Sequence, residues 1–194
     1  MSDRGHVEPV LDDETVERYA RQIIVPGVGA RGQARLLART VAVLGNSVGV
    51  EAARAYLAAA GVRVMTAPFA DAADCVVLAD TREPALELKL PRCSVDTPIA
   101  WYEIRERILA GGVATRDTLP HFSRDNARSE SIEDPYTLVA HRIGASDAAG
   151  MAVAALLGWL APGEQHDFCL DLLRGSPVLD DQWLGAVGTA KERS

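Results

Sequence analysis

The chain has 194 residues, which is enough for one ordinary domain with its own core, and a hydrophobic fraction of 48% excludes a mostly disordered protein. The net charge of −7 argues against nucleic acid or an anionic membrane surface as the main partner. The cysteines Cys75, Cys93 and Cys169 stand far apart, so neither a disulfide framework nor a cysteine-rich zinc site is predicted, and we expect no bound metal.

The first residues, 1–14, are acidic and lack the apolar segment of a secretory signal peptide. The longest apolar run, residues 151–161, is shorter than the roughly 20 residues that a membrane-spanning helix needs. Both observations predict a cytoplasmic protein without a membrane partner.

Two short helices are predicted ahead of the first strand. Asp12 or Asp13 suits an N-cap, and acidic residues follow in the first helical turn. Residues 14–25 then carry three apolar side chains at helical spacing: Val16, Tyr19 and Ile23. A Pro-Gly pair ends this pattern, and residues 29–39 form a second helix that leads directly into a strand. We predict that residues 1–38 form a helical arm.

The rest of the chain is organised around residues 39–62. Residues 41–44 form an apolar run with β-branched valines, which is typical of a buried parallel strand. The helix predicted for residues 50–60 is rich in alanine and leucine, and Gly61 is a suitable residue just past its end. Strand, glycine-bearing turn and helix together predict the opening βα unit of a nucleotide-binding α/β domain.

The turn of this unit is poorly suited to phosphate. Close approach of an anion requires glycines, whose backbone N–H groups are not shielded by side chains. Only two glycines are present, four residues apart, and valines stand where a pyrophosphate would lie. We therefore interpret the turn as a structural one and expect no nucleotide cofactor. Its residues are Gly45, Asn46, Ser47, Val48 and Gly49.

Residues 17–62 resemble the opening of the E1-like superfamily, the ThiF, MoeB and HesA group of adenylating enzymes. The matching features occur in order and without a gap: Arg18-Tyr19, Arg21-Gln22, Gly32-Gln33 with Leu36, the strand, Tyr56-Leu57-Ala58 and Ala60-Gly61-Val62. Enzymes of this group activate the C-terminus of ubiquitin-like sulfur carriers or of small peptides. The resemblance therefore implies a Rossmann-like fold, a dimer and a peptide-like partner.

The chain departs from this family where the chemistry would be. Of the family's G-x-G-G-x-G turn only Gly45 is kept, and no carboxylate ends the predicted strand of residues 63–69. Asp80 ends a predicted strand at residues 74–80, only 35 residues after Gly45, so whole βα units with the ATP-clamping arginine and lysine are missing. We interpret Asp80 as a helix cap rather than a metal ligand. The region in which the family carries its nucleophilic and zinc-binding cysteines contains none here.

The remaining elements follow the family outline more loosely. We predict a helix at residues 83–90, strands at 97–104 and 168–173, a polar crossover loop at 117–134 and a long helix at 143–160. Residues 107–115 either continue the strand before them or pair with it as a hairpin. The predicted fold is α/β: a truncated Rossmann-like, E1-like domain at residues 39–183, with a mostly parallel sheet flanked by helices on both faces, and a tail at 184–194.

Candidate binding residues come from one strand and from the arm. Trp101 and Tyr102 take opposite-facing positions of a strand, so we expect one in the core and the other in a partner-binding groove. A shortened sheet also exposes an edge, to which an extended peptide can add. The candidate peptide-binding residues are Ile99, Trp101, Tyr102 and Ile104. The candidate homodimer interface includes Arg18, Tyr19, Arg21 and Ile23.

These features predict a non-catalytic protein that binds a precursor peptide and presents it to modifying enzymes of the same ribosomal-peptide pathway. The resemblance suggests the E1-like proteins of crocagin-type biosynthesis as the nearest kind. Two other functions stay open: an ATP-dependent adenylyltransferase of the ThiF/MoeB type with an unusual nucleotide loop, and an inactive subunit of a heterodimeric E1-like enzyme. We assign no catalytic residue, because the four histidines His6, His121, His141 and His166 are scattered and nothing marks a dyad.

Overall fold

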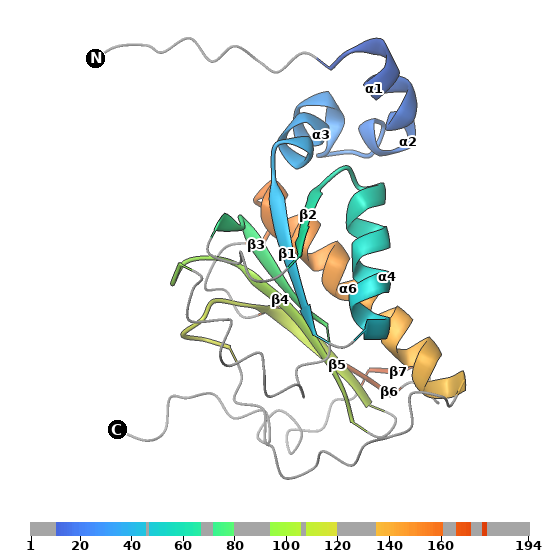
Figure 1. The fold of residues 1–194 in the computed structure, drawn as a ribbon, viewed down its shortest axis with the longest axis vertical. Coiled ribbons are helices and arrows are strands. Elements are labelled where there is room, and N and C mark those ends of the chain that lie inside the picture. Colours follow the sequence, from blue (N-terminus) through green and yellow to red (C-terminus); the bar gives the residue numbers. More distant parts are fainter. Residues whose placement is uncertain are drawn as a thin grey trace.

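A single sheet forms the centre of the computed structural model, which describes residues 11–45, 47–66, 72–79, 94–105, 108–119, 135–160, 166–171 and 176–177 (Figure 1). The sheet has seven strands in the order β2-β1-β3-β4-β5-β6-β7. In chain order these are β1 (Thr40–Gly45), β2 (Arg63–Thr66), β3 (Cys75–Ala79), β4 (Ile99–Arg105), β5 (Ile108–Ala114), β6 (His166–Asp171) and β7 (Ser176–Pro177).

Most of these strands run in one direction. β2, β1, β3 and β4 are parallel, whereas β5 reverses direction and pairs antiparallel with both β4 and β6. β6 therefore runs with β1 to β4 again, and the short β7 is antiparallel to it. β5 is thus the hairpin partner of β4 rather than its continuation, and the predicted α/β fold with a mostly parallel sheet is confirmed.

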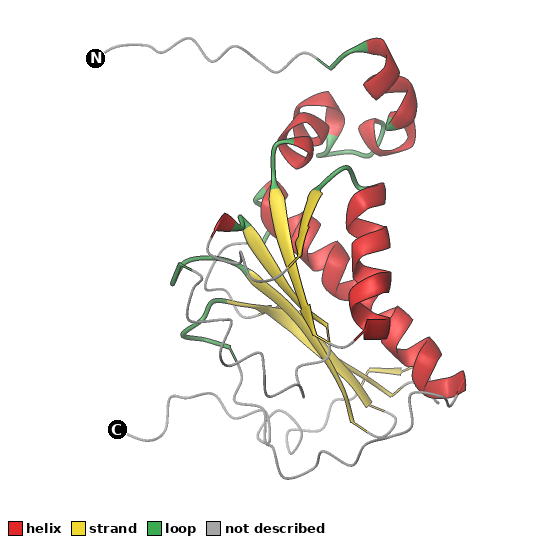
Figure 2. Ribbon diagram, viewed as in Figure 1, coloured by secondary structure: helices red, strands yellow, loops and turns green. Residues whose placement is uncertain are grey.

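The two long helices, α4 (Ser47–Ala59) and α6 (Pro135–Leu157), lie on the same face of the sheet (Figure 2). Successive side chains of a strand point to opposite faces, so each strand contributes to two apolar layers. The layer under the helices includes Val41, Val43, Val77 and Tyr102. The opposite face carries a second cluster: Ala42, Leu44, Val76, Leu78, Ile99, Trp101, Ala110 and Ala114. Among the described residues, both long helices therefore cover one face, and the helix predicted at residues 83–90 lies outside them.

α6 begins at Pro135, earlier than the predicted start at residue 143. Proline suits the first position of a helix, because the N–H that it lacks has no intrahelical acceptor there. The residues by which α6 contacts the sheet are mostly small, which lets the helix approach the strands closely. They include Ala140, Gly144, Ala145, Ala148, Ala149 and Ala152.

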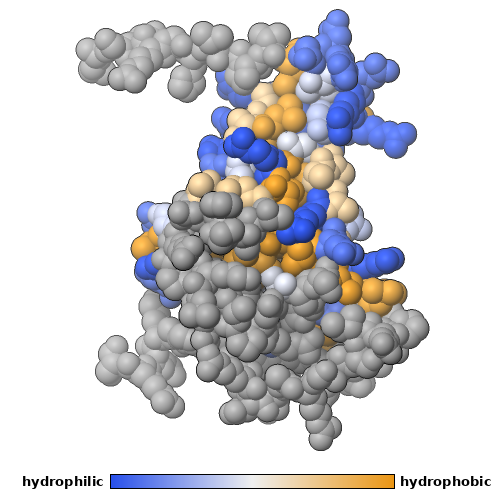
Figure 3. Space-filling view, in the orientation of Figure 1, coloured by the Kyte–Doolittle hydropathy of each residue, from blue (hydrophilic) through white to orange (hydrophobic). Residues whose placement is uncertain are grey.

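Three short helices form the N-terminal arm: α1 (Asp13–Arg18), α2 (Ala20–Ile23) and α3 (Gly29–Leu37). Asp12 is the N-cap of α1, and its carboxylate accepts a hydrogen bond from the Thr15 N–H at 2.8 Å. Hydrogen bonds from the side chain of Thr15 and, to a lesser degree, from its backbone N–H lower the pKa of Asp12. The single helix predicted at residues 14–25 is divided at Tyr19, where φ is −106°. Figure 3 shows hydrophilic side chains gathered over the arm.

The arm docks on the C-terminal end of α4 through two amide side chains. Gln22 Nε2 donates to the Ala59 carbonyl at 2.8 Å, and Gln33 Nε2 donates to the Ala60 carbonyl at 3.1 Å. The last carbonyls of a helix lack intrahelical partners, so these amides satisfy acceptors that the helix leaves open. Gly61 follows with φ +86°, and a Cβ there would lie 2.8 Å from Gln33 Nε2. Both the backbone conformation and the space at this position therefore require glycine.

None of the described helices is both long and apolar enough to cross a membrane. The predicted crossover loop is described only as far as residue 119, and the tail at residues 184–194 lies outside the described residues. The domain limits at residues 38 and 183 stay predictions.

Candidate functional site

The turn after β1 is the first candidate, because Rossmann-like sheets bind ligands at the carboxyl ends of their parallel strands. Gly45, the last residue of β1, has φ +135°, and a Cβ on it would overlap the carbonyl oxygen of Ala79 in β3. Glycine is therefore needed for the ends of β1 and β3 to come together. This requirement is independent of any bound anion.

The need for glycine at position 49, in the first turn of α4, is likewise explained by packing within the chain. A Cβ at this position would overlap the hydroxyl oxygen of Tyr102 in β4. That hydroxyl lies 3.2 Å from Nδ1 of His141 on α6, in a buried hydrogen bond whose donor depends on the histidine tautomer. The two rings meet edge to face, with their centroids 6.0 Å apart. One tyrosine thus contacts both long helices.

Gly144 on α6 packs against the ring of Tyr102. A Cβ there would lie 2.5 Å from Cδ2 of the tyrosine ring and 2.9 Å from Leu109 Cδ1. The Tyr102 hydroxyl therefore lies beside the first turn of α4, where a nucleotide-binding βα unit holds phosphate. Because Tyr102 and His141 are both 0% exposed, this arrangement can hold α4, α6 and the sheet in register.

Sequence reasoning did not find the Tyr102–His141 contact. The two residues are 39 positions apart, on a strand and a helix that no short motif connects. Of the other turn residues, Val48 is partly buried, whereas Asn46, the side chain of Ser47 and all of Asp80 lie outside the described residues. The described part of the chain contains no group of three side chains that could hold a metal ion.

The predicted peptide-binding residues on β4 are buried. Ile99 and Trp101 face the second apolar cluster, Tyr102 and Ile104 face the helices, and each is at most 1% exposed. β4 is also an inner strand, paired with β3 on one side and β5 on the other. The assignment of these four residues to a peptide groove is therefore wrong. The backbone groups of an inner strand are already paired with its two neighbours, and its buried aromatic side chains cannot anchor a peptide.

The predicted dimer residues divide into two groups. Tyr19 is 8% exposed and its ring packs beside Gly61 of the same chain, which leaves little of it for a subunit interface, and its place there stays a prediction. Arg18 and Arg21 are exposed and Ile23 is partly buried, and their place in an interface stays a prediction. The Arg18 guanidinium lies 5.5 Å over the centre of the Tyr19 ring, in a cation–π contact.

The two edge strands of the sheet differ in the backbone donors and acceptors that they present to an additional strand. Among the described residues, β2 pairs with β1 alone and β7 pairs with β6 alone. β7 has two residues, and one of them, Pro177, carries no N–H. The four residues of β2 include no proline. β2 is therefore the edge that presents both donors and acceptors.

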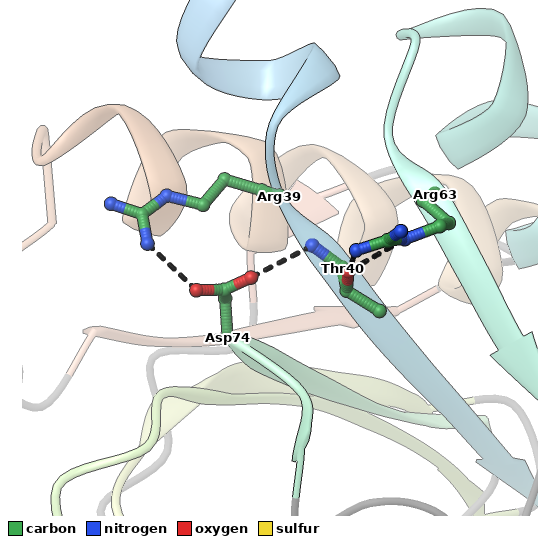
Figure 4. Close-up of polar contacts among 4 residues, drawn as sticks. All are labelled: Arg39, Thr40, Arg63 and Asp74. Carbon is green, nitrogen blue, oxygen red and sulfur yellow. Dashed lines mark hydrogen bonds and ion pairs between the residues drawn. The ribbon is translucent and has the colours of Figure 1, made fainter.

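Four polar residues lie close together at the amino ends of β1 and β2 and just before β3 (Figure 4). The Asp74 carboxylate accepts one hydrogen bond from Arg39 Nη1 at 2.7 Å and another from the Thr40 N–H at 2.8 Å. Arg63, the first residue of β2, donates to Thr40 Oγ1 through Nε at 3.0 Å and Nη2 at 2.8 Å. These contacts tie β1 to β2 and to the segment that leads into β3, at the amino ends of the strands.

Comparison with known proteins finds a partial match to an adenylyltransferase. No protein-family model matches the chain. The chain is 42% identical over 59 residues to the adenylyltransferase and sulfurtransferase MOCS3 of Drosophila willistoni. This match covers 30% of the chain but only 13% of that protein, so the chain spans a small part of the length of the curated relative.

Solved structures share the fold over most of the chain. The crystal structure of PaaA has a TM-score of 0.62 at 17% identity and covers 92% of this chain and 76% of that chain. The structure of E. coli MccB with MccA-N7isoASN has a TM-score of 0.57 at 12% identity, with 83% and 71% covered. Identities this low show a shared fold. Together with the partial sequence match, this fold supports the resemblance predicted from the sequence: a truncated E1-like protein.

Proposed function

We propose that the chain is a non-catalytic E1-like protein that binds a precursor peptide and presents it to the modifying enzymes of a ribosomal-peptide pathway. Within the described residues β2 pairs with β1 alone, and this open edge is the observation that carries the proposal, because an extended peptide can add to it as a further strand. This mode of binding uses the main-chain groups of β2 and therefore needs no nucleotide.

The turn after β1 favours peptide binding over adenylation. The hydroxyl of Tyr102 lies against Gly49 and is hydrogen-bonded to His141, so a phosphate at the start of α4 would have to displace it. Gly45 lies directly against the carbonyl of Ala79 in β3, so this glycine serves the packing of two strands rather than a phosphate. We therefore propose that no nucleotide cofactor takes part.

The structural neighbours fit a peptide partner. MccB was crystallised with MccA-N7isoASN, and the shared fold makes a peptide our proposed partner for this chain as well. The net charge of −7 supports this choice over nucleic acid or an anionic membrane. We place the protein in the cytoplasm, together with the enzymes that would modify its peptide.

A second candidate function is ATP-dependent adenylation. It is favoured by the 42% identity over 59 residues with MOCS3, which is an adenylyltransferase. The two functions differ in what they require for binding. Adenylation needs ATP before or together with the peptide, whereas presentation needs the peptide alone.

Calorimetric titration with the cognate precursor peptide separates the two. Without ATP, we expect a micromolar or tighter dissociation constant, about −8 kcal/mol or better. A parallel titration with ATP and Mg²⁺ is expected to give no heat at millimolar nucleotide. ATP binding tighter than about 100 µM, or peptide binding that appears only with ATP, would restore the adenylyltransferase as the favoured function.

A further inference from the structure

The backbone of β2 leaves alternate residues facing outward. The Arg63 N–H donates to the Arg39 carbonyl at 3.0 Å, so the backbone groups of Arg63 face β1. Each following residue of a strand points its N–H and C=O to the opposite side, and the pairing of β2 with β1 continues to Thr66. The backbone groups of Val64 and Thr66 therefore face the open edge.

Positive charge is concentrated in the part of the chain that builds this edge. Residues 18–63 contain seven arginines, no lysine and a single acidic residue, Glu51, which gives a net charge of +6 within a chain of −7. Most of these arginines are exposed. Within the described part of the chain, five of them form no ion pair with a carboxylate: Arg18, Arg21, Arg35, Arg54 and Arg63.

Arg63 lies on the edge strand itself. Its guanidinium donates to the neutral hydroxyl of Thr40, and the carboxylate of Asp74 is already bound by Arg39 and by the Thr40 N–H (Figure 4). The guanidinium lies on the β1 side of its strand, over Thr40, so Arg63 has to turn away from this hydroxyl to meet a carboxylate at the edge (Figure 4). It would exchange bonds to a neutral group for a charge-assisted pair, so an exposed arginine that is paired only with a hydroxyl is well suited to recognise an acidic group.

We propose that the β2 edge binds an acidic, extended peptide segment, which bonds to the backbone of Val64 and Thr66 and places an Asp or Glu side chain on Arg63. This inference rests on the proposed function and specifies the chemistry of the peptide. A basic segment would be repelled by the excess of arginine. A second copy of β2 would bring Arg63 toward its own counterpart, so the charge also disfavours edge-to-edge pairing of two chains.

Selection from a library of random linear peptides displayed on phage tests the chemistry without a known ligand. We expect enriched sequences in which Asp and Glu alternate with Val, Ile and Thr, and which are poor in Pro. Enrichment of peptides without acidic residues would overturn the acidic assignment and leave peptide binding intact. No enrichment at all would count against the proposed function itself.

A synthetic peptide of the enriched sequence then tests the site. Arg63→Glu is expected to weaken its binding by about tenfold or more at low salt, and by less at high salt. Arg63→Gln keeps a donor for Thr40 and removes the charge, so it serves if the glutamate variant folds poorly, with an expected loss of about threefold. Arg116→Glu is the matched control, since this exposed arginine follows β5, about 19 Å from β2 at four strand spacings. Unchanged affinity in both Arg63 variants, or an equal loss in the control, would overturn the proposal.

Amide hydrogen exchange followed by NMR tests the position of the peptide. The amides of Val64 and Thr66 are expected to exchange at least about tenfold more slowly with the peptide bound. Those of Arg63 and Met65 already face β1 and should change little. Protection of another strand with β2 unchanged would place the peptide elsewhere and overturn the assignment of the edge.

Discussion

Tyr102 determines which residue can stand at two positions on different helices. Gly49 on α4 and Gly144 on α6 both lie against its side chain, at the hydroxyl and at the ring. The sequence showed Gly49 only as a departure from a phosphate-binding pattern, and it showed nothing unusual at Gly144. Each glycine acquires a physical reason only when β4 is known to pass beneath both helices, which is a property of the tertiary structure.

The effect of Tyr102 on Gly144 can be measured by adding one methyl group. Gly144→Ala places a Cβ 2.5 Å from the tyrosine ring, and we expect a loss of about 1–3 kcal/mol in the free energy of unfolding. Gly150→Ala on the same helix is the control, because a Cβ there meets nothing within 4 Å. It should gain about 0.5–1 kcal/mol from helix propensity alone. Urea denaturation measures both, and equal effects at the two positions would contradict the role of Tyr102.

Asp147 on α6 makes stability depend on pH. Partial burial raises the pKa of its carboxyl, so the folded state binds this proton more tightly than the unfolded state does. The contribution of this group is therefore most favourable below the unfolded pKa and is lost as pH rises through the folded pKa. Asp147→Asn should stabilise the protein at pH 7 and make less difference at pH 4. Urea midpoints that shift equally at both pH values would show that burial of the charge is not the cause.

At the scale of elements, the arm explains why several residues of the E1-like match stand where they do. Gln22 and Gln33 bind the last carbonyls of α4, and Gly61 provides the turn that lets them approach. The sequence identified these residues as matches to the family but did not indicate their contacts. In this chain they fasten the arm to a helix end, a role that is separate from adenylation.

Removal of the buried amide side chain of Gln33 should weaken the docking of the arm on α4 and lower the free energy of unfolding. Gln33 is 0% exposed, so Gln33→Ala is expected to cost about 2–3 kcal/mol, through a lost hydrogen bond and a cavity beside α4. Gln22→Ala removes the same kind of bond at an exposed position and should cost about 1 kcal/mol or less. Thermal unfolding followed by circular dichroism provides the comparison. A larger effect at Gln22 would mean that burial does not control the strength of this docking.

At the scale of the whole molecule, the sequence predicted which segments form strands and helices better than it predicted which strands lie side by side. β1 could be predicted from local pattern alone, because residues 41–44 are an unbroken apolar run. The alanine-rich helix could also be predicted, but α4 begins at Ser47 rather than at residue 50, so most of the expected turn is helical. The position of β4 inside the sheet could not, because it depends on β5 folding back and on β6 pairing with β5 from far along the chain. This inner position explains why Trp101 and Tyr102 are both buried, although alternation alone suggested that one of them would face a partner.

The outer surface of α6 predicts a homodimer. Val139 and Ile143 lie one turn apart and are 54% and 38% exposed, on a helix with few charged residues. Covering these side chains would remove apolar surface from water, and a second copy of the chain is the expected cover. Arg18, Arg21 and Ile23 would belong to a separate part of the interface, because the arm contacts the other end of α6, at Leu157. Light scattering at micromolar concentration should report a mass near twice 20.7 kDa.

Substitution of one outward residue tests this interface. Ile143→Glu should shift the mass toward the monomer, because the interface would then bury an unpaired charge. Val95→Glu is the matched control, since Val95 is similarly exposed at 41% but lies on the turn before β4. A monomeric wild-type protein, or an equal shift in both variants, would contradict the dimer.

The contacts between the arm and α4 also set an order of assembly during synthesis. The hydrogen bonds of Gln22 and Gln33 span 37 and 27 residues, and the arm, β1, α4 and β2 all lie within residues 11–66. A ribosome adds roughly 5–20 residues per second, so this βαβ unit with its own cap emerges seconds before α6 and β6 exist. We expect the nascent chain to fold here first and β3 to add to it afterwards. The Arg63-bearing edge is then complete while most of the sheet has still to be translated.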